Sequence, residues 1–264
     1  MGWLERWWSK RGARARVREE AIASARGLLD EGRVREAFAA IERVLMDDPE
    51  AQELMHLAAT ILRRDAQPET AELFDRAADA PGDTQLLLQL GSDLLSRDAP
   101  ALAATFLERA LAFAPFDAVI RSELALAYAR QGRPDRVVET LALHPCLADD
   151  PGALFEFAWA SLLTGDLESA EGAARALAMT PQTRDLRRKL ENTLARARLG
   201  TAGAPDARDF LFIEHGALLL DAAGPYGGRY DALELDDARI VGLAARAAWA
   251  VRELVPLPHR VVAL

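Results

Sequence analysis

Three carboxylates near the C-terminal end of the chain are the side chains best suited to catalysis or metal binding. Glu214 and Asp221 each close a short apolar run, and Asp237 precedes a helical pattern. Carboxylate oxygens brought together at one sheet edge would bind a divalent cation. His215 has the chemistry of a general base, but it stands before a glycine in a two-residue turn, where we expect its ring to face solvent. The sequence therefore favours a non-catalytic protein and leaves an enzymatic role open.

Two other features contain residues found in phosphate-binding loops or zinc sites but lack the surrounding residues that such sites need. The glycine-rich stretch 224–228 lies between two expected strands and lacks the lysine of a phosphate-binding loop, which indicates a turn. Cys146 is the one cysteine of the chain, so an internal disulfide is excluded. With His144 it provides too few ligands for zinc, and we interpret it as a small packing residue. We expect no cofactor and no metal.

The elements around these residues predict a small α/β unit over residues 209–264. Two apolar runs, 210–214 and 217–221, form a hairpin, and 229–235 forms a third strand. A helix follows from Asp236 or Asp237 to about residue 254, and 260–264 forms a last strand, giving the order ββ-β-α-β. Residues 200–208 are a linker rich in small residues. Either the apolar final strand is tied into the sheet, or the chain is the front part of a longer protein.

Residues 18–199 contain a sequence repeat. Blocks begin at Arg18, Ala51, Thr84, Ala118 and Pro151, so they are spaced by 33 or 34 residues. Each block predicts two short amphipathic helices, with a small residue at its eighth place and again near its twentieth. Small residues let paired helices approach closely. Gly32, Gly132 and Gly165 are expected to stop the first helix, and Pro49, Pro81 and Pro115 to follow the second.

This pattern resembles the tetratricopeptide repeat (TPR), a family of stacked helix pairs. The resemblance implies a mainly α, right-handed solenoid of five repeats, and the helix expected over 185–199 would cap its exposed edge. In this family the first helices line a concave groove that holds a partner segment. The matching positions here are the fifth, ninth and twelfth of each block. The strongest candidates are Ile22, Arg26, Met55, Leu62, Leu88, Leu95, Ser122, Leu126, Phe155 and Trp159.

The occupant of this apolar lining is open from sequence alone. It could be an apolar or amphipathic segment of another protein, or the C-terminal region of the chain itself. A tight superhelix that buries the lining is a third alternative. Family members that clamp a terminal carboxylate carry Lys and Asn at the fifth and ninth places, and none of the five blocks has either. Large side chains such as Trp159 and Phe155 are the expected anchors, because such residues dominate binding energies.

The N-terminal residues 1–17 have a different character. Trp3, Trp7 and Trp8 fall on one helical face and are followed by basic residues. This face either caps the first repeat, docks a partner, or lies in a membrane interface. The first 18 residues hold six basic residues and one acid. The whole chain has a net charge of −9, so the remaining residues carry a net charge of −14. Such an acidic body argues against nucleic acid as a partner.

No stretch has the ~20 apolar residues that span a bilayer, and we expect a cytoplasmic protein. The sequence thus predicts a non-catalytic interaction scaffold. Two alternatives remain: an enzyme or enzyme subunit whose C-terminal unit is completed by a partner, and a peripheral membrane assembly factor anchored by its tryptophans.

Overall fold

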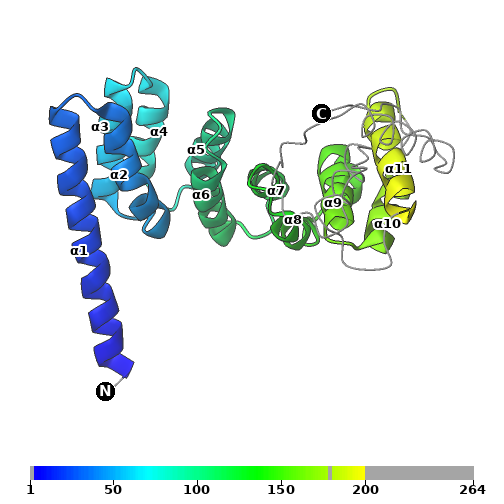
Figure 1. Cartoon of the computed structure of the whole chain (residues 1–264), viewed down its shortest axis with the longest axis horizontal. Helices are drawn as coiled ribbons and strands as arrows, with labels where there is room; N and C mark the ends of the chain where they lie inside the picture. Colours follow the sequence, from blue (N-terminus) through cyan, green and yellow to red (C-terminus); the bar gives the residue numbers. More distant parts are fainter. Residues whose placement is uncertain (1–2, 178–179, 200–264) are drawn as a thin grey trace, which may run out of the picture. The chain divides into compact units, whose positions relative to one another are not determined.

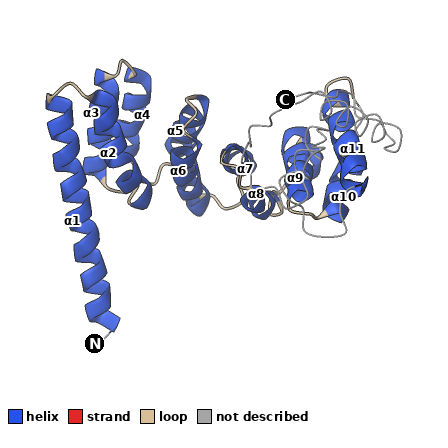
Figure 2. Ribbon diagram, viewed as in Figure 1, coloured by secondary structure: helices blue, strands red, loops and turns tan. Residues whose placement is uncertain are grey.

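The computed structural model describes residues 3–177 and 180–199, with side chains from Arg14 to Arg198 (Figure 1). It divides into two compact units, Met1–Pro145 and Cys146–Leu264. Every regular element in the described ranges is a helix, and Figure 2 shows only turns and loops between them. The expected linker 200–208 and the α/β unit 209–264 lie outside the described residues, so both stay predictions.

The first unit consists of four successive helix pairs. They are α1 (Trp3–Asp30) with α2 (Val34–Asp47), α3 (Gln52–Arg64) with α4 (Pro68–Asp79), α5 (Thr84–Ser96) with α6 (Pro100–Phe113), and α7 (Ala118–Arg130) with α8 (Pro134–Leu141). Three residues connect the helices of each pair, and each pair also packs on the next. The first pair differs because α1 continues unbroken across the boundary expected at residue 18.

The second unit begins with a short 3-10 helix, η1 (Leu147–Asp149). It continues with the pair α9 (Pro151–Leu163) and α10 (Leu167–Ala176), which is again joined by three residues. A further helix, α11 (Arg184–Leu199), packs on both of them. The core of this unit consists of apolar side chains from all three helices, among them Leu154, Ala158, Ala170, Leu190 and Leu194.

Helix ends follow from local chemistry that the sequence displays. Asp83 caps α5 by accepting hydrogen bonds from the backbone N–H groups of Gln85 and Leu86, at 3.0 and 3.1 Å. Asp117, Asp150 and Asp166 cap α7, α9 and α10 in the same way. The second helices α4, α6 and α8 instead begin with a proline, whose missing N–H is not needed there.

The three-residue connections share one backbone conformation. The middle residue has a positive φ in each of the five pairs, and these residues are Gly32 (76°), Ala66 (58°), Asp98 (59°), Gly132 (67°) and Gly165 (83°). Glycine adopts this left-handed region without strain, whereas a Cβ costs roughly 1–2 kcal/mol. The predicted stops at the three glycines are therefore confirmed, and two further pairs make the same turn without a glycine.

Close packing within a pair depends on the small residue at the eighth place. In the third pair this residue is Gly91 on α5, and a Cβ built there would lie only 2.5 Å from Cγ of Leu107 on α6. The other pairs have alanine at this place, and each of these alanines is at most 1% exposed: Ala25, Ala58, Ala125 and Ala158. The predicted role of small residues is confirmed here, and so is the repeat of paired helices.

We expect Gly91→Ala to lower the free energy of unfolding by about 1–3 kcal/mol, because the added methyl overpacks against Leu107. The matched control is Gly27→Ala on α1, where no atom lies within 4 Å of the new Cβ. This change should stabilise by roughly 0.5–1 kcal/mol through helix propensity. Chemical denaturation measures both variants, and equal effects would contradict the packing argument.

Replacing Ala66 with glycine should raise the free energy of unfolding by roughly 0.5–1 kcal/mol. The gain from relieving a positive φ exceeds the entropy that glycine adds to the unfolded chain. Asp98→Gly should gain less, since aspartate tolerates this region better than alanine does. Gly132→Ala is the reverse control and should destabilise. A thermal melt in which Ala66→Gly lowers the midpoint would show that the turn is not strained.

Candidate protein-interaction surface

The first-helix positions predicted to line a groove divide into buried and accessible sets. Ile22, Met55, Leu62 and Leu95 are at most 7% exposed, and Phe155 is 9% exposed. These five side chains belong to the packed interior, and first helices also pack on one another there: α1 on α3, α5 on α7, and α9 on α11. Direct contact with a partner is therefore left to the remaining positions, and the groove itself stays a prediction.

Two of the four accessible positions in the first unit make polar contacts, and the other two are apolar. Arg26 on α1 forms an exposed ion pair of 3.1 Å with Glu53 on α3. Ser122 on α7 lies 3.2 Å from Nε2 of the buried His144. Leu88 on α5 and Leu126 on α7 are partly exposed apolar side chains. This part of the predicted lining is thus a mixed surface with few large anchors.

The second unit concentrates aromatic and cationic groups. Phe155 and Trp159 occupy the fifth and ninth places of the fifth repeat, and their rings stack with centroids 5.8 Å apart at 25°. Lys189 on α11 places its Nζ 4.3 Å from the centroid of Trp159 and 5.7 Å from that of Phe155. A cation above a ring face is attracted by the ring quadrupole. Trp159 stays partly exposed, so this cluster is accessible.

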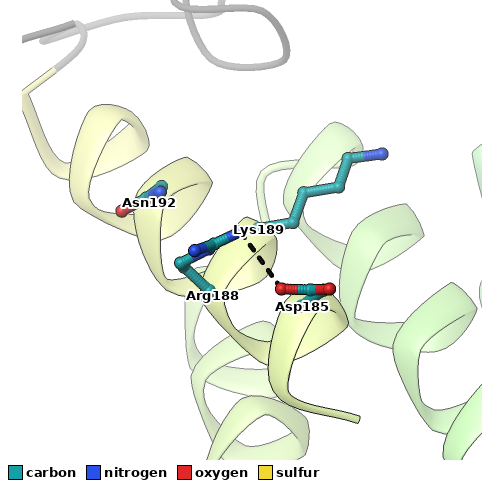
Figure 3. A pocket seen from close by; sticks show the side chains of 4 residues that line it. All are labelled: Asp185, Arg188, Lys189 and Asn192. Carbon is teal, nitrogen blue, oxygen red and sulfur yellow. Dashed lines mark hydrogen bonds and ion pairs between the residues drawn. The ribbon is translucent and has the colours of Figure 1, made fainter. Parts of the chain in front are cut away.

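Helix α11 continues the repeat register beyond the five predicted blocks. Arg188 and Asn192 stand 33 residues after Phe155 and Trp159, at the places that a sixth first helix would use. With Asp185 and Lys189 they line a hollow of about 420 Å³ (Figure 3). Arg188 donates to Asp185 at 3.1 Å across one turn of this helix. Figure 3 shows Lys189 reaching toward the neighbouring helix, away from Arg188.

The residues that line this hollow were not predicted from the sequence as site residues. The sequence predicts a capping helix over 185–199 and assigns none of its residues to a site. The signal that could have found them is the 33-residue offset from Phe155 and Trp159, which places Arg188 and Asn192 on the first-helix face. A second missed feature is a set of exposed apolar side chains near the α6–α7 and α8–η1 connections, namely Phe113, Phe116, Val119 and Leu143.

The pKa values of two carboxyl groups near α11 are shifted in opposite directions. Burial raises the pKa of Glu156 above the usual carboxyl value, because a low-dielectric surrounding disfavours the charged form, and the nearby Lys189 opposes that shift. The pKa of Glu171 on α10 is lowered instead, since Arg198 donates to its carboxylate at 2.7 and 3.0 Å. The cluster thus holds one carboxyl group that resists ionisation beside the rings.

Several predicted site residues cannot be placed. The side chains of Trp3, Trp7 and Trp8 lie outside the described residues, although the backbone of α1 is helical there. Glu214, Asp221, Asp237 and the 224–228 stretch also lie outside them. Within the described ranges, no group of three His, Cys, Asp or Glu residues is placed to hold a metal ion. None of the helices described is long and apolar enough to cross a bilayer.

Comparison with known proteins adds two solved structures. No protein-family model matches the sequence, and no curated protein matches it. The structure is similar to one described as the functional characterisation of Pseudomonas aeruginosa PilF, at 17% identity and a TM-score of 0.36, over 72% of this chain and 95% of that chain. It is also similar to PilW, described as a widely conserved type IV pilus biogenesis factor, at 21% identity and a TM-score of 0.39, over 70% and 87%. Likeness at this level supports no functional conclusion.

Glu156→Gln should raise the thermal midpoint at pH 7 and leave it unchanged at acidic pH. A carboxyl group whose folded pKa is raised stabilises the protein below its unfolded pKa, and this stability is lost as the pH rises through the folded pKa. The amide never ionises and so avoids that loss. Thermal melts from pH 3 to pH 8 measure the difference.

Glu171→Gln is the matched variant of opposite sign. Its pKa is lowered in the fold, so its stabilising effect exists above the unfolded pKa and disappears as the pH falls through the folded pKa. Replacing it should therefore lower the midpoint at pH 7 and have no effect at low pH. Melting curves in which both variants shift in the same direction would contradict the assigned electrostatics.

Proposed function

We propose that this chain is a non-catalytic interaction scaffold whose first-helix face binds a segment of a partner protein. The observation that carries the proposal is the stacked Phe155–Trp159 pair, with Trp159 partly exposed beside Lys189. A rigid aromatic platform offers a large apolar contact at low entropic cost, and its basic border favours an amphipathic segment over a purely apolar one. The stacked helix pairs support the proposal by holding this face in place.

The buried positions support this function indirectly. Ile22, Met55, Leu62 and Leu95 are buried, so they would support the face from inside without touching the partner. Within the first unit, the predicted positions that stay accessible are the partly exposed Leu88, Ser122 and Leu126 and the exposed Arg26. A cytoplasmic location and a protein rather than a nucleic-acid partner remain part of this proposal. No described residue favours the enzymatic or the membrane-anchored alternative.

Trp159→Ala should weaken binding of a partner segment at least tenfold, because loss of a central aromatic anchor costs about 2 kcal/mol or more. Segments are selected from a displayed peptide library on the wild-type chain, and their dissociation constants are measured by fluorescence anisotropy. Trp159→Phe keeps an aromatic ring and should retain most of the affinity. Leu143→Ala removes an exposed apolar side chain elsewhere and should have no effect.

Thermal melts establish that each variant is folded before binding is compared. Selected segments that bind wild type and Trp159→Ala equally well would remove this surface from the function, as would failure of the library to yield any segment.

A further inference from the structure

We propose that the N-terminal part of α1 binds a second copy of this chain, at the edge where the helix pairs of the first unit are connected to one another. The part of α1 involved is residues 3–17, which we name the α1 extension. Its counterpart is the connection edge, formed by residues 47–51, 79–83 and 113–119. Both surfaces belong to the first unit and share no residue with the Trp159 face.

The α1 extension projects from the first unit beyond the helix that α1 packs on. Helix α1 has 28 residues, whereas α3, α5 and α7 have 13 each. Arg18 forms an ion pair of 2.9 Å with Asp48, which directly follows α2, so the extension begins where α2 ends. At 1.5 Å per residue it is roughly 22 Å long. Figure 1 shows it continuing past α2 with no helix of the first unit beside it.

The extension is rich in groups that favour association. Its sequence contains three tryptophans at helical spacing, and five basic residues against one acid. Arg14 and Arg16 are exposed and form no ion pair among the described residues, and Val17 is 53% exposed. A helical segment of this length is only marginally stable in water unless it packs on another element. The extension therefore gains stability from a partner.

Contacts between distant residues join the parts of the connection edge into one surface. Glu50 in the first connection lies 3.4 Å from Nη2 of Arg109 on α6. One turn further along α6, Phe113 lies beside Gly82 in the second connection, where an added Cβ would be 3.8 Å from its ring. The third connection follows directly after Phe113. Asp48, the partner of Arg18, is also part of this edge, so the extension leaves the unit on the same side.

The connection edge has the chemistry that complements the extension. Phe113, Phe116 and Val119 are 54%, 80% and 58% exposed, and large apolar side chains gathered on a surface mark interaction sites. The edge contains six acidic and no basic residues. Arg18 and Arg109 each pair with one of these carboxylates from outside the edge, which leaves an excess of negative charge. Aromatic and acidic groups thus face a segment that is aromatic and basic.

The course of α1 directs the extension to another molecule. Helix α1 is uninterrupted from Trp3 to Asp30, so the extension leads away from its own connection edge instead of lying along it. Every copy of the chain carries both surfaces, and self-association of identical chains is the commonest form of assembly. The opposite charges of the two surfaces also speed their encounter.

Sedimentation velocity of the full-length chain over a range of concentrations tests the proposal. We expect a mass above that of one copy, and dissociation as salt rises, because salt screens the opposite charges. The extension variant, Arg14→Glu with Arg16→Glu, and the edge variant Phe116→Ser should each weaken association by about tenfold or more. Arg35→Glu is the matched control, since it reverses an exposed charge at the other end of α2 and should have no effect.

A mixture of the two variants distinguishes this contact from other modes of association. The edge variant keeps an intact extension, and the extension variant keeps an intact edge. An equimolar mixture should therefore restore a complex with one copy of each, detected by a fluorescent label on one variant. Two variants that stay apart on mixing would overturn the proposal, because pairing of one extension with another would show this result.

The remaining outcomes are equally decisive. A wild-type chain that stays monomeric at all concentrations would overturn the proposal. So would a monomer whose Arg14 and Arg16 are needed only to bind anionic vesicles, which would assign the extension to a membrane surface. A monomer that Phe116→Ser destabilises in a thermal melt would overturn it as well, by showing that the chain covers its own edge. Trp159→Ala should leave association unchanged, and a loss there would assign self-association to the Trp159 face instead.

Discussion

The closeness of the two helices in each pair is the constraint on which the rest of the structure depends. In the third pair, the side chain of Leu107 occupies the space where Gly91 would carry a Cβ, and alanines fill the same place in the other pairs. Helices that approach this closely expose large complementary surfaces to each other and gain dispersion contacts along their whole length. Within the first unit, each pair also packs on the next.

That stacking explains why the predicted lining is partly buried. First helices pack on one another at α1 and α3, α5 and α7, and α9 and α11, and side chains at the fifth and twelfth places such as Met55 and Leu95 are buried. In the second unit a neighbouring helix likewise covers part of the first helix, but the side chains at the contact are aromatic and cationic. There, α11 packs on α9 and places Lys189 over the rings of Phe155 and Trp159. The groups that remain accessible beside these rings depend on the residues that α11 carries.

Several polar groups in the packed interior have hydrogen-bond partners, whereas the buried Nε of Arg109 and Oγ of Ser161 have none among the described residues. Arg121 on α7 is 6% exposed, and its guanidinium donates to the carbonyls of Pro115 and Thr140, at distances of 2.6–3.2 Å. It therefore ties the α6–α7 connection to the end of α8. Ser92 likewise donates to Glu123 across the α5–α7 joint at 3.1 Å. Such partners fix the register of neighbouring helices, because a buried donor without an acceptor costs about 1–3 kcal/mol.

Local features could be predicted from the chain alone: the 33–34-residue period, the capping aspartates, the prolines that start or follow helices, and the glycines that end the first helices all act over a few residues. Other features arise only when distant segments meet. The period hides the break between the two units at Pro145, because α8 is short where the connection to α9 is long. It also cannot show that Ala66 and Asp98 adopt a glycine conformation, or that Lys189 lies over Trp159. Those outcomes depend on packing between residues far apart in the chain, where tertiary contacts outweigh local preference.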